Sequence, residues 1–403
     1  VFVESKVMLN YAAARTGKTT LIKYISNLMS SRKKLFLTKT HAALQNLQRA
    51  IEGPGADASF VSIDSFTKKI QLQDYQVVFV DECSTIDNRT MARFFEKIGP
   101  DTFVVLAGDT FQLEAIDFGN WFSYAKELMP DNAKIELLNT WRTDQESLIS
   151  LWDEVRKSGI LVREKLAMDG PFSTEISEQI LQNLSDDEDE VVLCLNYDGK
   201  FGLNNINALF QANNCNVAYT WQEWTYKVGD PILFTEPKKR FQSVFYNNLK
   251  GKIVGIEKET ASITFTVDID RLLSESDCAE EVEYIDTFDD KTRVRFTVYE
   301  DDGGNTDEES AESRMKSVVP FHLAYAVSIH KAQGLEYNSV KIIIPDSNAE
   351  KITHGIFYTA ITRAKKNLKI YWSPETMNLI LKNITEEQRE KKSLEIIKEK
   401  LLY

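Results

Sequence analysis

A glycine, a lysine and two threonines stand together near the N-terminus, between a predicted strand and a predicted helix. The segment Ala12–Thr20 follows the strand predicted over Val7–Asn10 and precedes a helix predicted to begin at Leu21. In such a loop, backbone N–H groups and the helix N-terminus bind phosphate, lysine neutralises the β- and γ-phosphate oxygens, and a threonine hydroxyl holds Mg²⁺. Lys18 and Thr19 are placed for the last two roles. The residues predicted to contact a nucleoside triphosphate are Ala14, Arg15, Thr16, Gly17, Lys18, Thr19 and Thr20.

The loop departs from the usual phosphate-loop pattern at two positions where glycine is common. Ala12 is a mild change, whereas Arg15 brings a side chain to a position where glycine permits unusual backbone angles and close approach. Two interpretations therefore stay open, a working hydrolase and a nucleotide-gated subunit with weak or lost turnover. A large gain in hydrolysis on Arg15→Gly would identify Arg15 as a lesion or an engineered change, and no gain would show that the loop tolerates arginine.

Two carboxylates directly follow the apolar strand predicted over Val77–Val80. Mg²⁺ on a nucleotide prefers oxygen ligands, and hydrolysis needs a group that polarises the attacking water. We predict Asp81 as a metal ligand and Glu82 as the residue that activates water. The strand predicted over Phe103–Ala107 is followed by Gln112, whose amide is placed to contact the γ-phosphate.

A parallel sheet would bring these residues to one edge. Up to about residue 140, β-rich apolar runs alternate with helical patterns, which indicates a parallel α/β sheet with ligands at the carboxyl ends of its strands. The predicted strands are Val7–Asn10, Leu35–Thr38, Phe60–Ile63, Val77–Val80, Phe103–Ala107 and Ile135–Leu138. A second α/β pattern contains strands at Val191–Leu195, Val217–Tyr219, Val340–Ile344 and Leu368–Trp372 and a helix around Leu203–Gln211.

The pattern changes to alternating strands between about Leu249 and Val319. The strands predicted there are Lys252–Ile256, Ser262–Val267 and Arg293–Tyr299. We predict a small antiparallel barrel inserted into the second α/β domain, with an acidic solvated loop. The run from Trp221 to Phe234 is interpreted as a strand, a turn and a strand leading to it, without a chemical role. The charged tail from Thr385 to Tyr403 indicates a surface helix.

Further motifs occur in the order found in superfamily 1 helicases. They are Thr38–Ala43, Ser62–Phe66, Leu138–Thr143, Val327–Glu336 and Phe357–Lys365. Together with the phosphate loop and the two carboxylates, they resemble those of helicases of the RecD-like and UvrD-like kind over nearly the whole chain. The resemblance implies an α/β fold with two RecA-like parallel-sheet motor domains and a small SH3-like β-barrel insertion in the second.

The resemblance also implies a division of the chain. The expected parts are residues 1–140, an ATP-binding motor domain 1A; 141–248, the first part of motor domain 2A with linking helices; 249–319, the inserted barrel with its acidic loop; 320–384, the remainder of domain 2A; and 385–403, the C-terminal surface helix. Lys18 and Arg363 then lie on different motor domains, so that the γ-phosphate would hold the two domains together only while it is present.

Roles for individual residues follow from the same resemblance. It implies that Arg142 contacts the γ-phosphate and that Arg363 is an arginine finger, which makes both catalytic beside Lys18, Glu82 and Gln112. It implies that Gly334 and Glu336 contact the nucleotide. Nucleic-acid contacts are implied for Thr38, Thr40, His41, Ser65, Phe66, His330 and Lys331. Outside this context, the two arginines would be interpreted as surface salt-bridge residues, and Phe66, Trp121 and Trp141 as packing residues.

Composition limits the partners that the chain can have. The net charge of −13 argues against nucleic acid, but Glu275–Glu312 holds fifteen acidic and three basic residues, which leaves only −1 on the rest. No apolar run approaches the roughly 18 residues of a membrane helix, so no membrane partner is expected. The four cysteines form no C-x-x-C pair, which predicts neither a zinc site nor disulfides and fits a cytoplasmic location. Val1–Lys6 lacks an initiator methionine and a signal peptide, so we expect the natural start to lie outside the sequence.

The resemblance implies ATP and Mg²⁺ as cofactors of a motor that moves along or unwinds nucleic acid. Single-stranded DNA is the expected strand, with RNA left open, and the barrel-like insertion favours the 5′–3′ polarity of the RecD-like branch. The alternative is a nucleotide-gated DNA-binding or scaffolding subunit of a larger complex, for example with a nuclease in repair or anti-phage defence. A metabolic P-loop kinase explains neither the second α/β pattern nor Thr362 and Arg363 after His330–Glu336.

Overall fold

The computed structural model describes most of the chain. The described residues are 5–12, 16–51, 58–69, 75–112, 120–137, 145–157, 161–177, 189–235, 241, 244–278, 281–301 and 317–384. They fall into two compact units, residues 1–176 with 336–403, and residues 177–335. The predicted surface helix over residues 385–403 lies outside the described residues, and so does most of the predicted acidic loop, residues 302–316.

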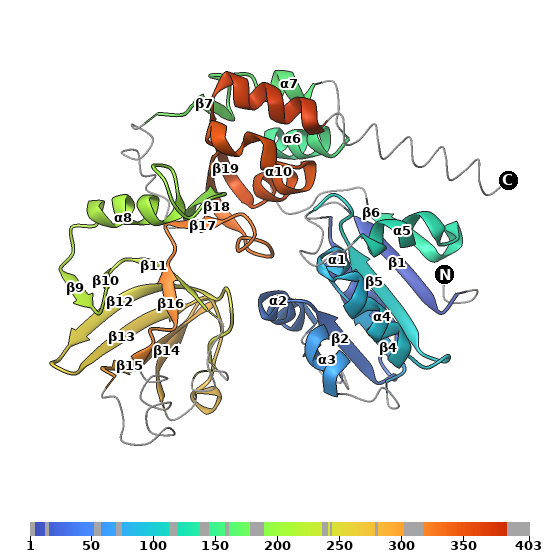
Figure 1. The fold of residues 1–403 in the computed structure, drawn as a ribbon. Coiled ribbons are helices and arrows are strands. Elements are labelled where there is room, and N and C mark those ends of the chain that lie inside the picture. The colour runs from blue at the N-terminus through green and yellow to red at the C-terminus, as the bar shows by residue number, and fades with distance from the viewer. Residues whose placement is uncertain are drawn as a thin grey trace. The chain divides into compact units, whose positions relative to one another are not determined.

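A six-stranded parallel sheet forms the centre of the first unit (Figure 1). Its strands are β1 (Val7–Ala12), β2 (Lys34–Thr38), β3 (Ala58–Ser62), β4 (Val77–Val80), β5 (Phe103–Gly108) and β6 (Lys134–Leu137), in the order β3-β2-β4-β5-β1-β6. All six predicted strands are confirmed. The carboxyl ends of β2, β4 and β5 are therefore neighbours, because parallel strands end at the same edge of a sheet.

Helices cover both faces of this sheet. The apolar side chains of α1 (Lys18–Leu28) and α2 (His41–Ile51) share one hydrophobic cluster with one face of the strands. Those of α3 (Ile63–Lys69), α4 (Asn88–Lys97) and α5 (Trp121–Leu128) share a second cluster with the opposite face. Strands buried on both faces read as continuous apolar runs, which explains why they could be predicted from the sequence.

The rest of the first unit contains a second set of parallel strands. Their pairing runs β18 (Tyr337–Ile343), β19 (Ala364–Trp372), β7 (Ser173–Glu175). The accompanying helices are α6 (Glu146–Lys157), α7 (Val162–Lys165), α10 (His354–Ile361) and a helix over residues 374–384. Two hydrogen bonds join α6 to α10: Trp152 Nε1 donates to Ile361 O at 3.0 Å, and His354 Nε2 lies 2.9 Å from Val155 O.

In the second unit, β8 (Glu190–Cys194) pairs in parallel with β17 (Ala326–Ser328), and α8 (Leu203–Asn213) packs against β17. The prediction that Val217–Tyr219 belongs to a parallel sheet was wrong. Strand β9 (Ala218–Trp221) pairs antiparallel with β10 (Trp224–Lys227) as a hairpin. Its first three side chains are exposed or only partly buried, so it lacks the buried faces that a strand of a covered parallel sheet needs.

A six-stranded antiparallel sheet follows the hairpin, and it confirms the predicted change of pattern. Its strands are β11 (Pro231–Phe234), β12 (Lys250–Lys258), β13 (Ser262–Ile269), β14 (Val282–Phe288), β15 (Lys291–Tyr299) and β16 (Phe321–Leu323), in the order β14-β15-β13-β12-β11-β16. Alternate side chains of β13 and β15 are buried, as expected for strands with one covered face. The sheet extends from Pro231 to Leu323, beyond both predicted limits of the insertion. Its SH3-like character stays a prediction.

A buried carboxylate ties this sheet to α8. Asp230, which is 0% exposed, accepts hydrogen bonds from Gln211 Nε2 at 2.5 Å, Asn214 Nδ2 at 2.9 Å, Lys227 N at 2.8 Å and Tyr325 Oη at 2.8 Å. Burial first, and then the charge and hydrogen bond of Asp230, raise the pKa of Tyr325, which therefore stays a donor. Within the described residues, no helix is long and apolar enough to cross a membrane.

Candidate nucleotide and nucleic-acid site

The predicted phosphate loop leads directly into α1. Gly17 precedes the helix with φ of 91°, a left-handed conformation that L side chains rarely adopt. The helix begins at Lys18 and not at Leu21 as predicted, because the last residues of the loop already form its first turn. Lys18 is 8% exposed, and its Nζ donates to Ala12 O at 3.4 Å. Thr16 is buried, Thr19 is partly buried and Thr20 is exposed, while Ala14 and Arg15 lie outside the described residues.

The two predicted catalytic carboxylates follow β4. Asp81 is 5% exposed, and its Oδ1 accepts a hydrogen bond from Glu82 N at 2.9 Å. Glu82 has a left-handed φ of 54°, an uncommon conformation for a residue with a side chain. Thr85 stabilises it, since its N and Oγ1 donate to Glu82 O at 3.0 and 2.8 Å. The turn that presents Glu82 is therefore held in one conformation by local hydrogen bonds.

A third carboxylate lies at the end of β5. Asp109 is 0% exposed, and its Oδ1 accepts a hydrogen bond from Phe111 N at 3.0 Å. Burial raises the pKa of Asp109 and the charge of Glu82 adds to this effect, whereas Lys18 and Arg156 oppose it. Strands β4, β5 and β1 are neighbours in the sheet, so Glu82, Asp109 and Lys18, which follow these strands, lie at the same edge. Gln112 follows on the same loop and is 6% exposed.

The residues at this edge fit a magnesium ion held largely by phosphate. Among the described residues, no three His, Cys, Asp or Glu side chains converge as a metal cage. Mg²⁺ in nucleotide enzymes takes one or two protein oxygens and completes its shell with phosphate oxygens and water. Glu82 Oε2 and Asp109 Oδ2 are buried without a hydrogen-bond partner among the described residues, which suits a site that receives a cation or water. Thr19 and Asp81 would hold the ion.

The segments that follow β2 and β3 expose several of the residues predicted to contact nucleic acid. Thr40 and His41 are exposed at the start of α2, where Thr40 Oγ1 accepts a hydrogen bond from Ala43 N at 3.2 Å. Ser65 is exposed at the start of α3, and its Oγ accepts from Ser62 Oγ at 2.9 Å. These three polar side chains are available to phosphate or sugar oxygens.

Two of the predicted nucleic-acid residues are buried, which contradicts direct contact. Thr38 is 0% exposed, and its Oγ1 donates to Thr40 O at 2.8 Å, so it shapes the loop instead. Phe66 is also 0% exposed and packs edge-to-face against Phe94 at 5.9 Å between ring centroids. Thr38 is the last residue of β2 and Phe66 is the fourth residue of α3, so each shares a motif with exposed neighbours although its own side chain is buried. The packing interpretation of Phe66 is therefore the correct one.

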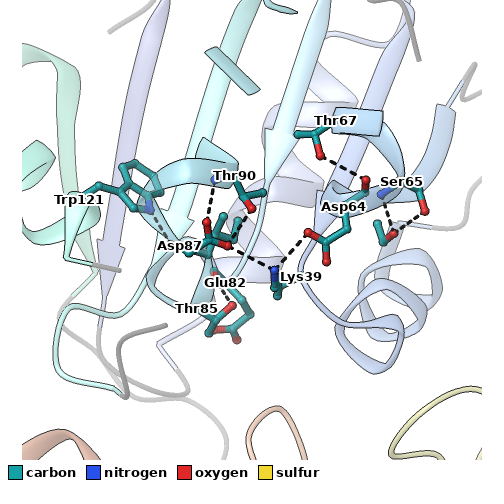
Figure 2. Close-up of polar contacts among 11 residues, drawn as sticks. Lys39, Asp64, Ser65, Thr67, Glu82, Thr85, Asp87, Thr90 and Trp121 are labelled. Atoms are coloured by element: carbon teal, nitrogen blue, oxygen red, sulfur yellow. Dashed lines mark hydrogen bonds and ion pairs between the residues drawn. The ribbon is translucent and has the colours of Figure 1, made fainter. Parts of the chain in front are cut away.

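An ion-pair network joins the loops after three neighbouring strands. Figure 2 shows Lys39 between Asp64 and Asp87, at 3.1 and 3.5 Å between Nζ and the carboxylate oxygens. Asp87 is the N-cap of α4, and its carboxylate accepts from Thr90 N and Thr90 Oγ1, both at 2.7 Å. Partial burial opposes ionisation of Asp87, but the Thr90 hydrogen bonds and the Lys39 charge outweigh it and lower its pKa.

This lowered pKa gives Asp87 a pH-dependent contribution to stability. Because the folded pKa lies below the unfolded value, the contribution is complete above about pH 4 and is lost as the pH falls through the folded pKa. We expect Asp87→Ala to cost about 1 kcal/mol at pH 7 and less at pH 3, as measured by urea unfolding. Glu96→Ala, an exposed change on the same helix, should cost within about 0.5 kcal/mol at both pH values. An equal loss for Asp87→Ala at pH 7 and pH 3 would contradict the role of its charge.

The remaining predicted residues are distributed over both units. In the first unit, Arg363 is 5% exposed, and its Nε donates to Thr359 O at 3.0 Å, while Glu336 pairs with Lys365 at 3.7 Å. In the second unit, His330 is exposed and Lys331 partly buried, and Gly334 has φ of 81°. Arg142 lies outside the described residues. The structure thus groups Lys18, Asp81, Glu82 and Gln112, whereas Arg363 rests against its own helix.

The sequence did not indicate a set of aromatic and charged residues beside this site, which we call the Phe111 cluster. The ring of Phe111 lies 6.2 Å from His354 and 6.3 Å from Tyr358, both on α10, and the Arg156 guanidinium lies 5.7 Å from it. The cluster connects the loop of Asp109 and Gln112 to the helix that precedes Arg363. Local pattern could not have shown it, because its members are distant in sequence, and the motifs that contain Phe111 and Tyr358 do not indicate that the two rings meet.

Replacing Phe111 should weaken the connection between the Gln112 loop and the Arg363 helix. We expect Phe111→Ala to lower kcat for ATP hydrolysis about tenfold, with a smaller change in KM, because Gln112 and Arg363 would no longer be held in a fixed relation. Phe111→Tyr keeps the ring and should restore most of the rate. Tyr124→Ala, which removes an exposed ring from α5, should hydrolyse ATP like the wild type. Wild-type kinetics for Phe111→Ala would exclude this role.

The chain matches two family models. One, described as an AAA domain, covers residues 2–168, and the other, described as a UvrD-like helicase C-terminal domain, covers residues 323–371. An uncharacterized protein of Methanocaldococcus jannaschii is 24% identical over 97% of this chain and 39% of its own length. The RecBCD enzyme subunit RecD of Mycolicibacterium smegmatis is 23% identical over 73% of this chain and 50% of its own length. The chain therefore spans half or less of these two relatives.

Solved structures show the same fold. A Pif1 helicase from Bacteroides in complex with ADP-AlF3 and single-stranded DNA matches with a TM-score of 0.53 at 16% identity, over 97% of this chain and 95% of that one. A Pif1 helicase from Candida albicans matches with a TM-score of 0.52 at 16% identity, over 94% of this chain and 96% of that one. The fold and the arrangement of the site resemble those of P-loop nucleotide-binding proteins with RecA-like parallel sheets. The family and RecD matches confirm its resemblance to superfamily 1 helicases of the RecD-like and UvrD-like kind.

Proposed function

We propose that the chain is an ATP- and Mg²⁺-dependent motor that moves along nucleic acid or unwinds it. The observation that carries this proposal is the common edge of the first sheet. Lys18 and the Asp81–Glu82 pair lie there, and Thr40 and Ser65 are exposed in the segments that follow the neighbouring strands β2 and β3. Groups for hydrolysis and for strand binding on adjacent loops are what a nucleic-acid motor requires.

The chemistry follows from the side chains at this edge. Lys18 neutralises the β- and γ-phosphate oxygens, and the N-terminus of α1 adds its backbone N–H groups. When bound, Mg²⁺ supplies positive charge to the phosphates. Glu82 accepts a proton from the attacking water while the oxygen of that water forms a bond to the γ-phosphorus. The bond between the γ-phosphorus and the oxygen that bridges it to the β-phosphate breaks at the same time. Gln112 contacts the γ-phosphate, and Arg142 and Arg363 stabilise the charge that develops on it.

Loss of the γ-phosphate would then be converted into movement. Gly334 and Glu336 contribute to the nucleotide contacts, and His330 and Lys331 to the strand contacts of the second motor domain. Because nucleotide and strand contacts share loops, a change in nucleotide state alters the grip on the strand. We propose single-stranded DNA as the strand, in keeping with the Pif1 complex, and 5′–3′ movement.

Steady-state ATP hydrolysis with Mg²⁺, with and without single-stranded DNA, tests the proposal. We expect the strand to stimulate hydrolysis, and we expect strand affinity to fall steeply with salt, because phosphate contacts dominate it. If the folded protein hydrolyses no ATP in either condition, the proposal that the chain is a motor is wrong. Unwinding of a 3′-tailed but not a 5′-tailed duplex would overturn the polarity alone, and preference for RNA oligonucleotides would overturn the choice of strand.

A second candidate is a nucleotide-gated binding or scaffolding subunit, for example beside a nuclease in repair or anti-phage defence. Arg15 favours it, because arginine stands where phosphate loops commonly have glycine. Nucleotide-dependent strand binding without turnover would support this candidate. A large gain in hydrolysis on Arg15→Gly would then show that the remaining machinery is intact.

A further inference from the structure

Lys39 occupies a central place at the edge of the first sheet. It lies between Thr38 and Thr40 in the loop after β2, and β2 lies between β3 and β4 in the sheet. Helix α3, which follows β3 directly, carries the exposed Ser65, and the loop after β4 carries Asp81 and Glu82. Lys39 is therefore flanked on one side by a strand-binding candidate and on the other by the candidate catalytic carboxylates.

The ammonium group of Lys39 contacts both neighbouring loops. Its Nζ donates a hydrogen bond to Asp64 Oδ1 at 3.1 Å and lies 3.5 Å from Asp87 Oδ2 (Figure 2). The Lys39 side chain is 29% exposed and that of Asp87 10%, so the second pair is less screened by water than a surface ion pair. One flexible cation thus links two carboxylates from different loops.

Local hydrogen bonds hold the segment between Glu82 and Asp87. The short helix η1 (Cys83–Thr85) fills it, and Thr85 donates two hydrogen bonds to Glu82 O. Asp87 is fixed at the other end by Thr90, and the neighbouring Ile86 O accepts from Trp121 Nε1 at 2.8 Å (Figure 2). If Asp87 moves, the backbone of Glu82 is therefore expected to move with it.

The other end of the link is equally close to the strand-binding candidates. Asp64 directly precedes Ser65, and Thr67 Oγ1 donates to Asp64 O at 3.2 Å within the first turn of α3. Ser65 N in turn donates to Ser62 Oγ at 3.3 Å. A phosphate that contacts Ser65 or Thr40 would shift the charges around Lys39, because it approaches the same short loops.

We propose that Lys39 is a positioning residue that couples strand binding to the orientation of Glu82. The inference rests on the proposed motor function and goes beyond it, since it assigns the link between the two activities to one side chain. When the nucleic-acid strand binds at Ser65 and Thr40, it changes the ion pair between Lys39 and Asp64. The ion pair between Lys39 and Asp87 changes with it and shifts the turn that presents Glu82. Lys39 touches neither nucleotide nor reacting atoms in this role.

The test compares basal and strand-stimulated ATP hydrolysis in Lys39→Met, measured over a range of strand concentrations with strand affinity measured in parallel by fluorescence anisotropy. We expect basal hydrolysis to stay near the wild-type rate, and maximal stimulation at saturating strand to fall about five- to tenfold. Lys39→Arg should restore most of the stimulation. Lys68→Met, which removes an exposed charge from α3, is the matched control, and the strand should stimulate its ATP hydrolysis as much as that of the wild type.

The partner variant sharpens the result. Asp64→Asn should lower maximal stimulation like Lys39→Met, and the double variant should be no worse than either single variant, because both remove the same link. If Lys39→Met only weakens strand affinity and reaches wild-type stimulation at saturation, Lys39 is a phosphate contact and the inference is overturned. Additive losses would also overturn it. If the wild type itself shows no stimulation by the strand, the motor proposal fails first.

Discussion

Replacing Glu82 by glutamine should lower steady-state ATP hydrolysis about 10²- to 10⁴-fold. Glutamine keeps the size of the side chain and can occupy the same left-handed backbone, but it has no carboxylate to accept a proton from the attacking water. The proposed nucleotide contacts are those of Lys18, the N-terminus of α1 and Asp81, so ATP binding should stay within about threefold of the wild-type affinity. Phosphate release and binding of a fluorescent ATP analogue measure the two effects separately.

Glu96→Gln is the matched control for this change. It removes an exposed carboxylate from α4 and should leave hydrolysis unchanged. A Glu82→Gln protein that hydrolyses ATP within a few-fold of the wild type would remove Glu82 from the role of general base. Asp109, the other carboxylate with a buried unpartnered oxygen at this edge, would be the next residue to replace.

The second large effect is expected on stability, at Asp230. Asp230→Ala removes one acceptor that serves Gln211, Asn214, Lys227 N and Tyr325, and leaves these donors buried without it. We expect a loss of roughly 3 to 5 kcal/mol in the unfolding free energy of the second unit. Hydrogen exchange followed by mass spectrometry over residues 203–235 in increasing urea reports this unit separately from the first.

Asp290→Ala removes an exposed carboxylate from the turn between β14 and β15 and should cost within about 0.5 kcal/mol. Asp230→Asn keeps the shape of the side chain but turns an N–H donor toward the other donors. Its loss of unfolding free energy should therefore lie between those of Asp230→Ala and Asp290→Ala. If the amides of residues 203–235 exchange at the same rate in Asp230→Ala as in Asp290→Ala, the hydrogen bonds to Asp230 contribute no more to stability than hydrogen bonds to water would.

The buried parallel strands could be predicted from sequence because each is a continuous apolar run that ends at polar residues. The run Val77–Val80 was predicted with the bounds that β4 has, and the neighbouring strands differ by only a few residues. Strand β9 was misassigned because a short run such as Val217–Tyr219 carries no signal for the kind of sheet that it enters. Its exposed side chains decide in favour of a hairpin, and exposure is a property of the folded chain.

In the candidate site too, residue types and their spacing could be predicted from sequence, whereas burial and contacts depend on the fold. The motifs indicated Lys18, Asp81 and Glu82 by residue type and spacing, and the structure has all three at one edge of the first sheet, while their chemical roles stay a prediction. They did not separate the exposed Ser65 from the buried Phe66, since neighbouring residues of a helix point in different directions around its axis, and only the packing decides which direction is buried. Lys39 was visible as a residue but not as a link, because its contacts depend on the strand order β3-β2-β4, which differs from the order along the chain.

The pairing of β11 with β16 has a consequence for the history and engineering of the chain. These strands begin and end the antiparallel sheet, and Ile232 and Leu323 are opposite each other across the pair. The whole segment between them leaves and returns at one point, so the entropy of closing it depends only weakly on its length. This module should accept deletion to a short turn, exchange for a foreign domain or growth in related genes, while α8 and β17 keep their places in the scaffold.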